Sequence, residues 1–383
     1  MTPILPGATI GILGGGQLGR MMTLAARTLG YGVQILDPDP DCPARPIADR
    51  CITARFDDVA ATVALARECD VITVEIEKIG LDAMRAAAAL VPVRPGAHVL
   101  HVVQNRARQK AWLRDNGFPL GEYWDAVDAT SLQGAQRASG GAALYVKSTT
   151  GGYDGRGQVR LEPGGSVEDA WRALGGGPVV AERALNIEAE ISVLVARSPS
   201  GAMATHPPAL NHHVNGVLDW SVIPAPIAAH TAGRAIELGR AIAEALDVVG
   251  LLAVELFLLP DGHLMVNELA PRPHNTFHHT ELSSLTSQFE QAIRAVCDLP
   301  LGSGEVLQPA AIANLFGDLW LRGSPPPFDE ALRLSGVRIH LYGKQPRAGR
   351  KVGHIGAVAP TADEAVAHVQ QARALLQSGG RRG

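Results

Sequence analysis

Two acidic residues on apolar strands constrain this sequence most. Residues 251–259 and 263–266 are apolar runs joined by a Pro-Asp-Gly turn, a pattern typical of an antiparallel β-hairpin. The first run carries Glu255, and Asn267 and Glu268 follow the second. A carboxylate on an apolar strand is costly unless its charge is compensated. The facing oxygen ligands therefore predict a Mg²⁺ site that handles a nucleotide, unless both acids lie on solvated strand faces.

Composition excludes several classes of protein. The 383 residues suffice for two or three domains, and 46% of them are hydrophobic. The net charge of −4 argues against nucleic-acid binding by a basic surface. The first residues lack the pattern of a secretion signal, and no apolar run is long enough to span a membrane. Four cysteines without a Cys-x-x-Cys motif predict neither a zinc site nor disulfides, and we expect a cytoplasmic protein with no membrane partner.

The first hundred residues alternate between strand-like and helix-like segments. Apolar runs at 9–13, 33–36 and 71–77 predict strands, and such alternation is typical of a parallel sheet with helices on both faces. A Gly-x-Gly-x-x-Gly motif at 14–19 has the form of a dinucleotide fingerprint, with Asp37 where a ribose-binding acid is expected. A nicotinamide-dependent oxidoreductase is therefore one interpretation, although nothing downstream resembles the second half of a dehydrogenase.

A glycine-rich loop follows a predicted strand in the middle of the chain. Lys147 lies at the end of that strand, and the loop at 149–158 contains four glycines. A lysine beside such a loop suits the neutralisation of phosphate charge under a closing lid. The alternative is a mobile surface loop without a ligand, but a plain spacer would not need Tyr153, Asp154 and Arg156. Helices are expected over 104–116 and 231–246, and strands over 144–148, 178–182 and 189–196.

Taken in order, these segments resemble the ATP-grasp superfamily and, within it, the PurK-type N5-carboxyaminoimidazole ribonucleotide synthases. The resemblance runs from Ile10 to Val358. It rests on Gly-Gln-Leu-Gly-Arg at 16–20, Gly-Gly-Tyr-Asp-Gly-Arg-Gly-Gln at 151–158, Asn-Glu-Leu-Ala-Pro-Arg-Pro-His-Asn at 267–275 and Gly-Arg-Lys-Val-Gly-His at 349–354. The second and third motifs together are highly specific.

The resemblance implies an α/β (α+β) ATP-grasp fold in three domains. We expect an N-terminal, Rossmann-like (pre-ATP-grasp) parallel-sheet domain, similar to that of biotin carboxylase, over 1–103. An ATP-grasp domain is expected over 104–300, with a mobile subdomain at about 118–185. A small C-terminal domain is expected over 301–383, and the family suggests a homodimer.

The resemblance also implies an activity. ATP would phosphorylate bicarbonate to carboxyphosphate, whose carboxyl passes to the amine of aminoimidazole ribonucleotide in purine biosynthesis. Carboxyphosphate is short-lived in water, which explains a lid that excludes solvent. A close alternative is the ATP- and formate-dependent glycinamide ribonucleotide transformylase, against which the motifs at 151–158 and 267–275 favour bicarbonate. A nucleotide-binding regulatory protein without catalysis is a further alternative, although every acid expected to hold metal is present.

Carried over by position, the family motifs assign residues to each ligand. Mg²⁺ is expected on Glu255 and Glu268, with Asn267 assisting. Contacts to ATP are expected from Arg106, Lys147, Gly152, Tyr153, Asp154, Gly155, Arg156, Gly157, Gln158, Glu182, Arg183, Ala184, Leu185, Glu190, His213, Asn267 and Glu268. The groups expected to act on bicarbonate and carboxyphosphate are Tyr153, Asp154, Arg156, Arg272, His274 and Asn275. The residues expected to bind the ribonucleotide are Gln17, Leu18, Glu75, Arg272, Lys344, Arg350 and Lys351.

Two segments depart from the family pattern. Lys78 stands where an asparagine is usual, and a lysine there could pair with Glu75 or Glu77. After Asn275 the family commonly continues Ser-Gly-His, whereas this chain has Thr-Phe-His at 276–278, which changes a turn beside the expected carboxyphosphate site. Hard Mg²⁺ prefers oxygen ligands, so three nearby histidines are expected to be polar neighbours rather than ligands: His212, His278 and His279.

Overall fold

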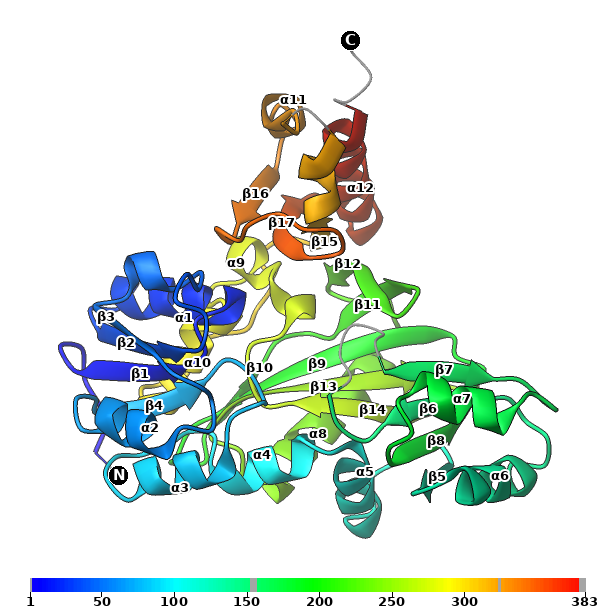
Figure 1. Cartoon of the computed structure of the whole chain (residues 1–383). Helices are drawn as coiled ribbons and strands as arrows, with labels where there is room; N and C mark the ends of the chain where they lie inside the picture. The colour runs from blue at the N-terminus through cyan, green and yellow to red at the C-terminus, as the bar shows by residue number, and fades with distance from the viewer. Residues whose placement is uncertain (1, 152–156, 323–324, 379–383) are drawn as a thin grey trace.

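Three β-sheets organise the chain (Figure 1). The computed structural model describes residues 2–151, 157–322 and 325–378. The N-terminal parallel sheet lies at the left of Figure 1, and a small antiparallel sheet lies at the right. A nine-stranded sheet joins the middle of the chain to the C-terminal part, whose helix α12 stands at the top. This arrangement confirms the predicted α/β class with a parallel N-terminal sheet.

The N-terminal sheet has the strand order β3-β2-β1-β4. Because side chains alternate along a strand, each face of the sheet has its own core. Ile10 and Ile12 pack with Met21 and Met22 of α1 on one face, while Leu13 packs with α2 and α3 on the other. The elements are β1 (Thr9–Leu13), α1 (Gln17–Thr28), β2 (Gly32–Asp37), η1 (Arg45–Ile47), β3 (Arg50–Thr53), α2 (Val59–Ala66), β4 (Val71–Val74), α3 (Leu81–Ala88) and α4 (Ala97–Val103).

The small antiparallel sheet has the order β5-β8-β6-β7 and a separate core. A capping box begins α6. The side chain of Asp128 accepts from the backbone N–H of Ser131, and the hydroxyl of Ser131 accepts from the backbone N–H of Asp128. The elements are α5 (Arg106–Asp115), which leads into the sheet, then β5 (Tyr123–Ala126), α6 (Ala129–Ala138), β6 (Leu144–Ser148), β7 (Gln158–Leu161), α7 (Val167–Ala173) and β8 (Val179–Arg183).

The large sheet has the order β14-β13-β9-β11-β12-β15-β17-β16, with β10 paired to β9. Strand β12 pairs with β15, so the C-terminal strands continue the central sheet without a break. The strands are β9 (Ala189–Arg197), β10 (Met203–Thr205), β11 (Ala209–Val214), β12 (Val217–Ile223), β13 (Gly250–Leu258), β14 (Leu264–Ala270), β15 (Ala310–Phe316), β16 (Val337–Leu341) and β17 (Lys351–Val358). The remaining helices are α8 (Ala229–Ala245), η2 (Asn275–Phe277), α9 (Thr280–Ser283), α10 (Gln288–Val296), η3 (Gly317–Arg322), α11 (Phe328–Leu332) and α12 (Ala362–Ser378).

One hydrophobic core connects the parts that surround the predicted ligand sites. Helix α1 packs against α10, and Met22, Phe289 and Tyr342 belong to the same buried cluster. That cluster also includes Leu251 of β13. The N-terminal sheet, the predicted metal hairpin and the C-terminal strands are therefore held together by continuous apolar packing.

The glycine-rich turn at 14–19 binds carboxylates of its own chain. The backbone N–H groups of Gly16 and Gly19 donate to the two oxygens of Glu75, each at 2.6 Å. The N–H of Gly15 donates to Asp37 at 2.7 Å. Helix N-termini attract anions, and here these two side chains supply the negative charge. The amides that would hold the pyrophosphate of a dinucleotide are therefore already used, which argues against the oxidoreductase interpretation.

Some predicted elements begin or end elsewhere. The strand predicted over 71–77 ends at Val74. The backbone N–H of Glu75 still donates to Leu13 of β1, while its side chain accepts from two N–H groups at the start of α1. The helix predicted from residue 104 begins at Arg106, since the side chain of Asn105 accepts from the N–H of Arg108 as an N-cap. The predicted hairpin is confirmed, with its second strand extended to Ala270.

The close packing of this turn predicts opposite effects for two glycine substitutions. A Cβ on Gly19 would lie 2.3 Å from the backbone oxygen of Gly14, whereas a Cβ on Gly233 of α8 would meet nothing within 4 Å. Gly19→Ala should lower the melting temperature, with a loss of about 1–3 kcal/mol from overpacking. The control, Gly233→Ala, should stabilise the exposed helix by about 0.5–1 kcal/mol. Scanning calorimetry of both variants tests this, and equal shifts would contradict the packing.

Candidate functional site

The predicted metal residues face one another across β13 and β14. Glu255 pairs with Glu268 in the ladder and Leu256 pairs with Val266, so Asn267 is an additional residue in β14. Such a β-bulge redirects side chains, and Asn267 donates from Nδ2 to Oε2 of Glu255 at 3.2 Å. The two acids and the amide thus lie on one side of the hairpin, as the sequence predicts.

The carboxylate pair lacks a full complement of positive charge among the described residues. Burial and the neighbouring Glu268 raise the pKa of Glu255 to about 7. Burial opposes a charge on His213, but the carboxylates of Glu190, Glu255 and Glu268 together raise its pKa; its Nδ1 lies 2.7 Å from Glu190. A divalent cation would remove the repulsion, and the oxygen ligands fit Mg²⁺.

Arg106 connects the carboxylate pair to the small antiparallel sheet, on which Lys147 also lies. Arg106 donates from Nη1 to the carbonyl of Ser148 at 2.8 Å, and its Nη2 lies 3.7 Å from Oε2 of Glu268. Lys147 of β6 and Gln158 of β7 are partners in the antiparallel ladder, at the ends of the two strands that the glycine-rich loop connects. Gly157 is described, and its carbonyl accepts from Ser148 at 2.8 Å. Five predicted site residues lie outside the described residues: Gly152, Tyr153, Asp154, Gly155 and Arg156.

A buried charge cluster surrounds Glu182. Its carboxylate lies 3.1 Å from Nζ of Lys147 and 3.2 Å from Nζ of Lys110. Burial disfavours the charge of Glu182, but the two lysines hold its pKa below the usual range. Burial lowers the pKa of Lys110, which is only 2% exposed. The sequence interpretation missed Lys110, although its position one helical turn after Arg106 is a usable signal.

Three further residues predicted to contact ATP lie on and after β8. The guanidinium of Arg183 pairs with Glu122 and lies 5.9 Å from the ring centre of Trp124. The backbone N–H of Ala184 donates to Ala143 at 2.9 Å. Leu185 packs over Gly121, where a Cβ would meet its Cδ1 at 3.2 Å. The strand end thus keeps a fixed position between β5 and β6.

The segment at 272–275 contains groups suited to a small anion. Nε of Arg272 pairs with Glu77 at 2.7 Å, and nearby carboxylates raise the pKa of Arg272 against the effect of burial. Nε2 of His274 lies 3.5 Å from Glu255, and burial holds its pKa well below 6.5. Both polar side-chain atoms of Asn275 are buried without a hydrogen-bond partner among the described residues. Such an unsatisfied amide is costly, which indicates a ligand. The sequence interpretation did not assign Glu77 as a site residue.

The predicted ribonucleotide residues come from four segments that are distant in sequence: 17–18, 75, 272 and 344–351. Nζ of Lys344 donates to Oε1 of Gln17 at 2.9 Å, and its charge acts on the buried Glu75. Leu18 is buried in the N-terminal core. Arg350 donates to the carbonyl of Gln345 at 3.2 Å. The charge of Lys351 acts on both His274 and His278, so β17 borders the segment at 272–275.

The departures from the family pattern leave the site polar. Phe277 is fully buried, and its ring lies 5.7 Å from His279 and 6.3 Å from His206, inside the core. Thr276 places its hydroxyl 2.9 Å from Nδ1 of His274 and so orients that ring. Lys78 is exposed, while Glu77 pairs with Arg272. His278 and His279 are fully buried, and the ring of His212 stacks on Trp220 at 5.0 Å.

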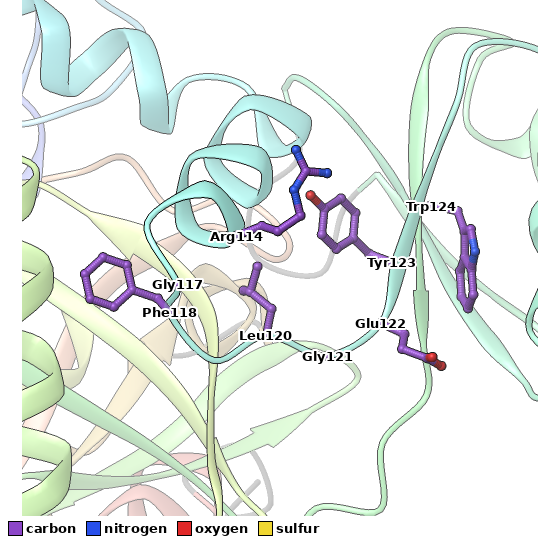
Figure 2. Close-up of a pocket in the computed structure, with 8 residues that line it drawn as sticks. All are labelled: Arg114, Gly117, Phe118, Leu120, Gly121, Glu122, Tyr123 and Trp124. Atoms are coloured by element: carbon purple, nitrogen blue, oxygen red, sulfur yellow. The ribbon is translucent and has the colours of Figure 1, made fainter.

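A cavity of about 450 Å³ lies on β5, next to the end of β8 (Figure 2). It lies between the end of α5 and β5, and Figure 2 shows the ring of Tyr123 turned toward Arg114. None of the predicted site residues that the structure describes lines it. Its lining residues are Arg114, Gly117, Phe118, Leu120, Gly121, Glu122, Tyr123 and Trp124.

Family models match most of the chain. They describe a ribonucleotide synthetase preATP-grasp domain at residues 7–104, an ATP-grasp domain at 111–289 and a phosphoribosylaminoimidazole carboxylase C-terminal domain at 310–368.

The described residues contain no helix long and apolar enough to cross a membrane.

Relatives of known function match over nearly the whole chain. The N5-carboxyaminoimidazole ribonucleotide synthase of Bacillus subtilis is 39% identical and covers 94% of both chains. That of Brucella melitensis is 40% identical over 94% of this chain and 98% of its own. A crystal structure of PurK, an N5-carboxyaminoimidazole ribonucleotide synthetase, in an ADP complex aligns with a TM-score of 0.93, 38% identity and full coverage of both chains. The Aspergillus clavatus enzyme in complex with ADP and 5-aminoimidazole ribonucleotide aligns with a TM-score of 0.88, at 32% identity over 96% of this chain and 98% of its own.

The buried charge cluster predicts a non-additive response to substitution. Glu182→Gln leaves Lys110 and Lys147 without their anion and should destabilise the protein by about 3 kcal/mol. Adding Lys110→Met removes one of the two cations, so the double variant should melt above Glu182→Gln alone. The more exposed ion pair of Arg183 and Glu122 offers a control, because Glu122→Gln should lower the stability by no more than about 1 kcal/mol. Calorimetric melting of these variants tests this prediction. A double variant that loses the sum of the two single losses in stability would contradict the cluster.

Proposed function

The chain belongs to the N5-carboxyaminoimidazole ribonucleotide synthases of the ATP-grasp superfamily, and we propose that it carboxylates 5-aminoimidazole ribonucleotide with bicarbonate at the expense of ATP. The products are N5-carboxyaminoimidazole ribonucleotide, ADP and phosphate, in purine biosynthesis. The curated relatives carry this name over nearly their full length, which favours bicarbonate over formate chemistry.

One observation carries the proposal for the site. The carboxylates of Glu255 and Glu268 lie beside the segment at 272–275, in which the buried amide of Asn275 has no partner among the described residues. His274 lies between the two, 3.5 Å from Glu255. A nucleotide phosphate held over the carboxylate pair would thus approach an anion held at Asn275.

The reaction is the one that membership of the family implies, and the charges of these groups suit it. An oxygen of bicarbonate attacks the γ-phosphorus of ATP, ADP leaves, and carboxyphosphate forms; the amine of the ribonucleotide then attacks the carboxyl carbon and phosphate leaves. Mg²⁺, when bound at Glu255 and Glu268, neutralises phosphate charge. Arg106 and Lys147 offset the remaining negative charge. His274 is held neutral by burial, so it donates or accepts a hydrogen bond without adding charge.

The ribonucleotide site is proposed between the N-terminal turn and β17. Arg272 and Asn275 would hold bicarbonate and then carboxyphosphate. Lys344, Arg350 and Lys351 would bind the terminal phosphate by charge-assisted hydrogen bonds. The Aspergillus clavatus structure with ADP and 5-aminoimidazole ribonucleotide supports one protein binding both ligands.

Other sequence expectations stay proposals. We retain the domain division at residues 103 and 300, the closing subdomain at about 118–185, a homodimer and a cytoplasmic location. The separate core of the β5–β8 sheet supports a subdomain that moves as a unit.

Release of ADP by the purified protein tests the proposed function. With Mg²⁺ATP, ADP should form only when both 5-aminoimidazole ribonucleotide and bicarbonate are supplied, in buffer freed of carbon dioxide. Glu268→Gln should abolish this turnover and leave the melting temperature near that of the wild type. Glu68→Gln, at an exposed ion pair, is the matched control and should retain full activity.

Two results would contradict the proposal. Turnover with glycinamide ribonucleotide and formate in place of these substrates would assign the transformylase activity. Full activity in Glu268→Gln would remove that residue from the metal site.

A further inference from the structure

A second group of potential metal ligands lies apart from the carboxylate pair. Glu281 of α9, His340 of β16 and His354 of β17 each offer one ligand atom, and these atoms all lie within 4.8 Å of one another. His340 and His354 are direct partners in the β16–β17 ladder. Their rings stack with centres 5.2 Å apart and planes at 15°. The antiparallel pairing thus presents two imidazoles side by side toward one carboxylate.

The two imidazoles are in the neutral state that a cation needs, and the carboxyl loses its proton when the ion binds. Burial lowers the pKa of His340, with Arg20 adding to the effect, and burial lowers the pKa of His354 to about 3. Both imidazoles are therefore neutral and free to donate a lone pair at neutral pH. Burial raises the pKa of Glu281 to about 7, and its carboxylate lies 3.9 Å from Nδ1 of His340. A cation would complete the pairing of this acid.

Tyr342 supports His354 in the way an outer-shell group supports a metal ligand. Its hydroxyl lies 2.7 Å from Nδ1 of His354, which leaves Nε2 for coordination. Metal-binding histidines usually hold their second ring nitrogen in such a hydrogen bond. The side chains of Glu281 and His340 are 31% and 27% exposed, so an ion can enter from solvent on their side.

We propose that Glu281, His340 and His354 form a site for a borderline divalent cation such as Zn²⁺ or Co²⁺. Two imidazoles and one carboxylate, with a fourth position for water, match the ligand preferences of these ions and not those of Mg²⁺. Bond lengths of about 2.0–2.2 Å require the ligand atoms to draw closer, and the partly exposed Glu281 side chain can make most of that adjustment.

The bound ion would tie α9 to the C-terminal strands. The ring of His354 also stacks on His278 at 4.8 Å, and Nε2 of His278 lies 3.5 Å from Nε2 of Gln17. The ion would thus stiffen the junction of the N-terminal turn, α9 and β17. This inference does not depend on the proposed function, because its test measures binding and melting without turnover.

Cobalt absorption spectroscopy tests the site. Untagged protein is stripped with EDTA, transferred to buffer with excess Mg²⁺ to occupy oxygen-only sites, and titrated with Co²⁺. Visible d–d bands should saturate at one equivalent, and Zn²⁺ should abolish them and raise the melting temperature by several degrees. Both effects should be lost in His340→Gln and in Glu281→Gln. The control His263→Gln alters an exposed histidine beside Asp261 and should behave as the wild type.

The same titration can overturn the proposal. Absence of saturable bands in the wild type would do so, as would bands of equal intensity in both Glu281→Gln and His340→Gln. Loss of the bands when Mg²⁺ is raised further would also contradict it, because an imidazole site should not yield to a hard cation. Melting of both variants in EDTA at the wild-type temperature separates loss of binding from loss of fold.

Discussion

The repulsion between Glu255 and Glu268 is the constraint on which the site depends. Both acids lie on adjacent strands of the central sheet, and the bulge at Asn267 brings the amide to the same side. Arg106 reaches Glu268 only at 3.7 Å, so the pair is incompletely neutralised within the described residues. The repulsion lowers the stability of the folded protein, and a cation that relieves it binds, together with its nucleotide, more tightly for that reason.

The chain compensates its buried acids in different ways, and the difference indicates which acids need a cation. Glu75 accepts two backbone N–H groups at the start of α1, and Glu182 lies between two lysines. These two carboxylates are satisfied by the protein itself. Among the residues that the structure describes, no group fully satisfies the pair at Glu255 and Glu268 or the amide of Asn275, which lies in the neighbouring segment. We therefore expect the reaction to take place at the acids whose charge the protein itself does not neutralise.

The sequence predicts local features well and long-range pairings poorly. The hairpin, the α/β class and the family were predictable because their signals are runs and motifs of contiguous residues. The pairing of Lys110 with Glu182 was not, since the partners are far apart in sequence and no local pattern joins them. The glycines at 14–19 were first interpreted as a dinucleotide motif, yet their lack of side chains makes room for Glu75. Likewise, only the fold shows that Phe277 points into the core.

The pH dependence of cation binding to the carboxylate pair tests the account most directly. Mn²⁺ serves as an oxygen-preferring probe, and its binding to nucleotide-free protein is measured by electron paramagnetic resonance between pH 5.5 and 8. Because the pKa of Glu255 is raised to about 7, a proton must leave before the ion binds. Affinity should fall about tenfold per pH unit below 7 and level off above it, and Glu268→Gln should weaken binding and move the transition to lower pH. Affinity that is independent of pH, or unchanged in Glu268→Gln, would contradict a site built on the repulsion of these two carboxylates.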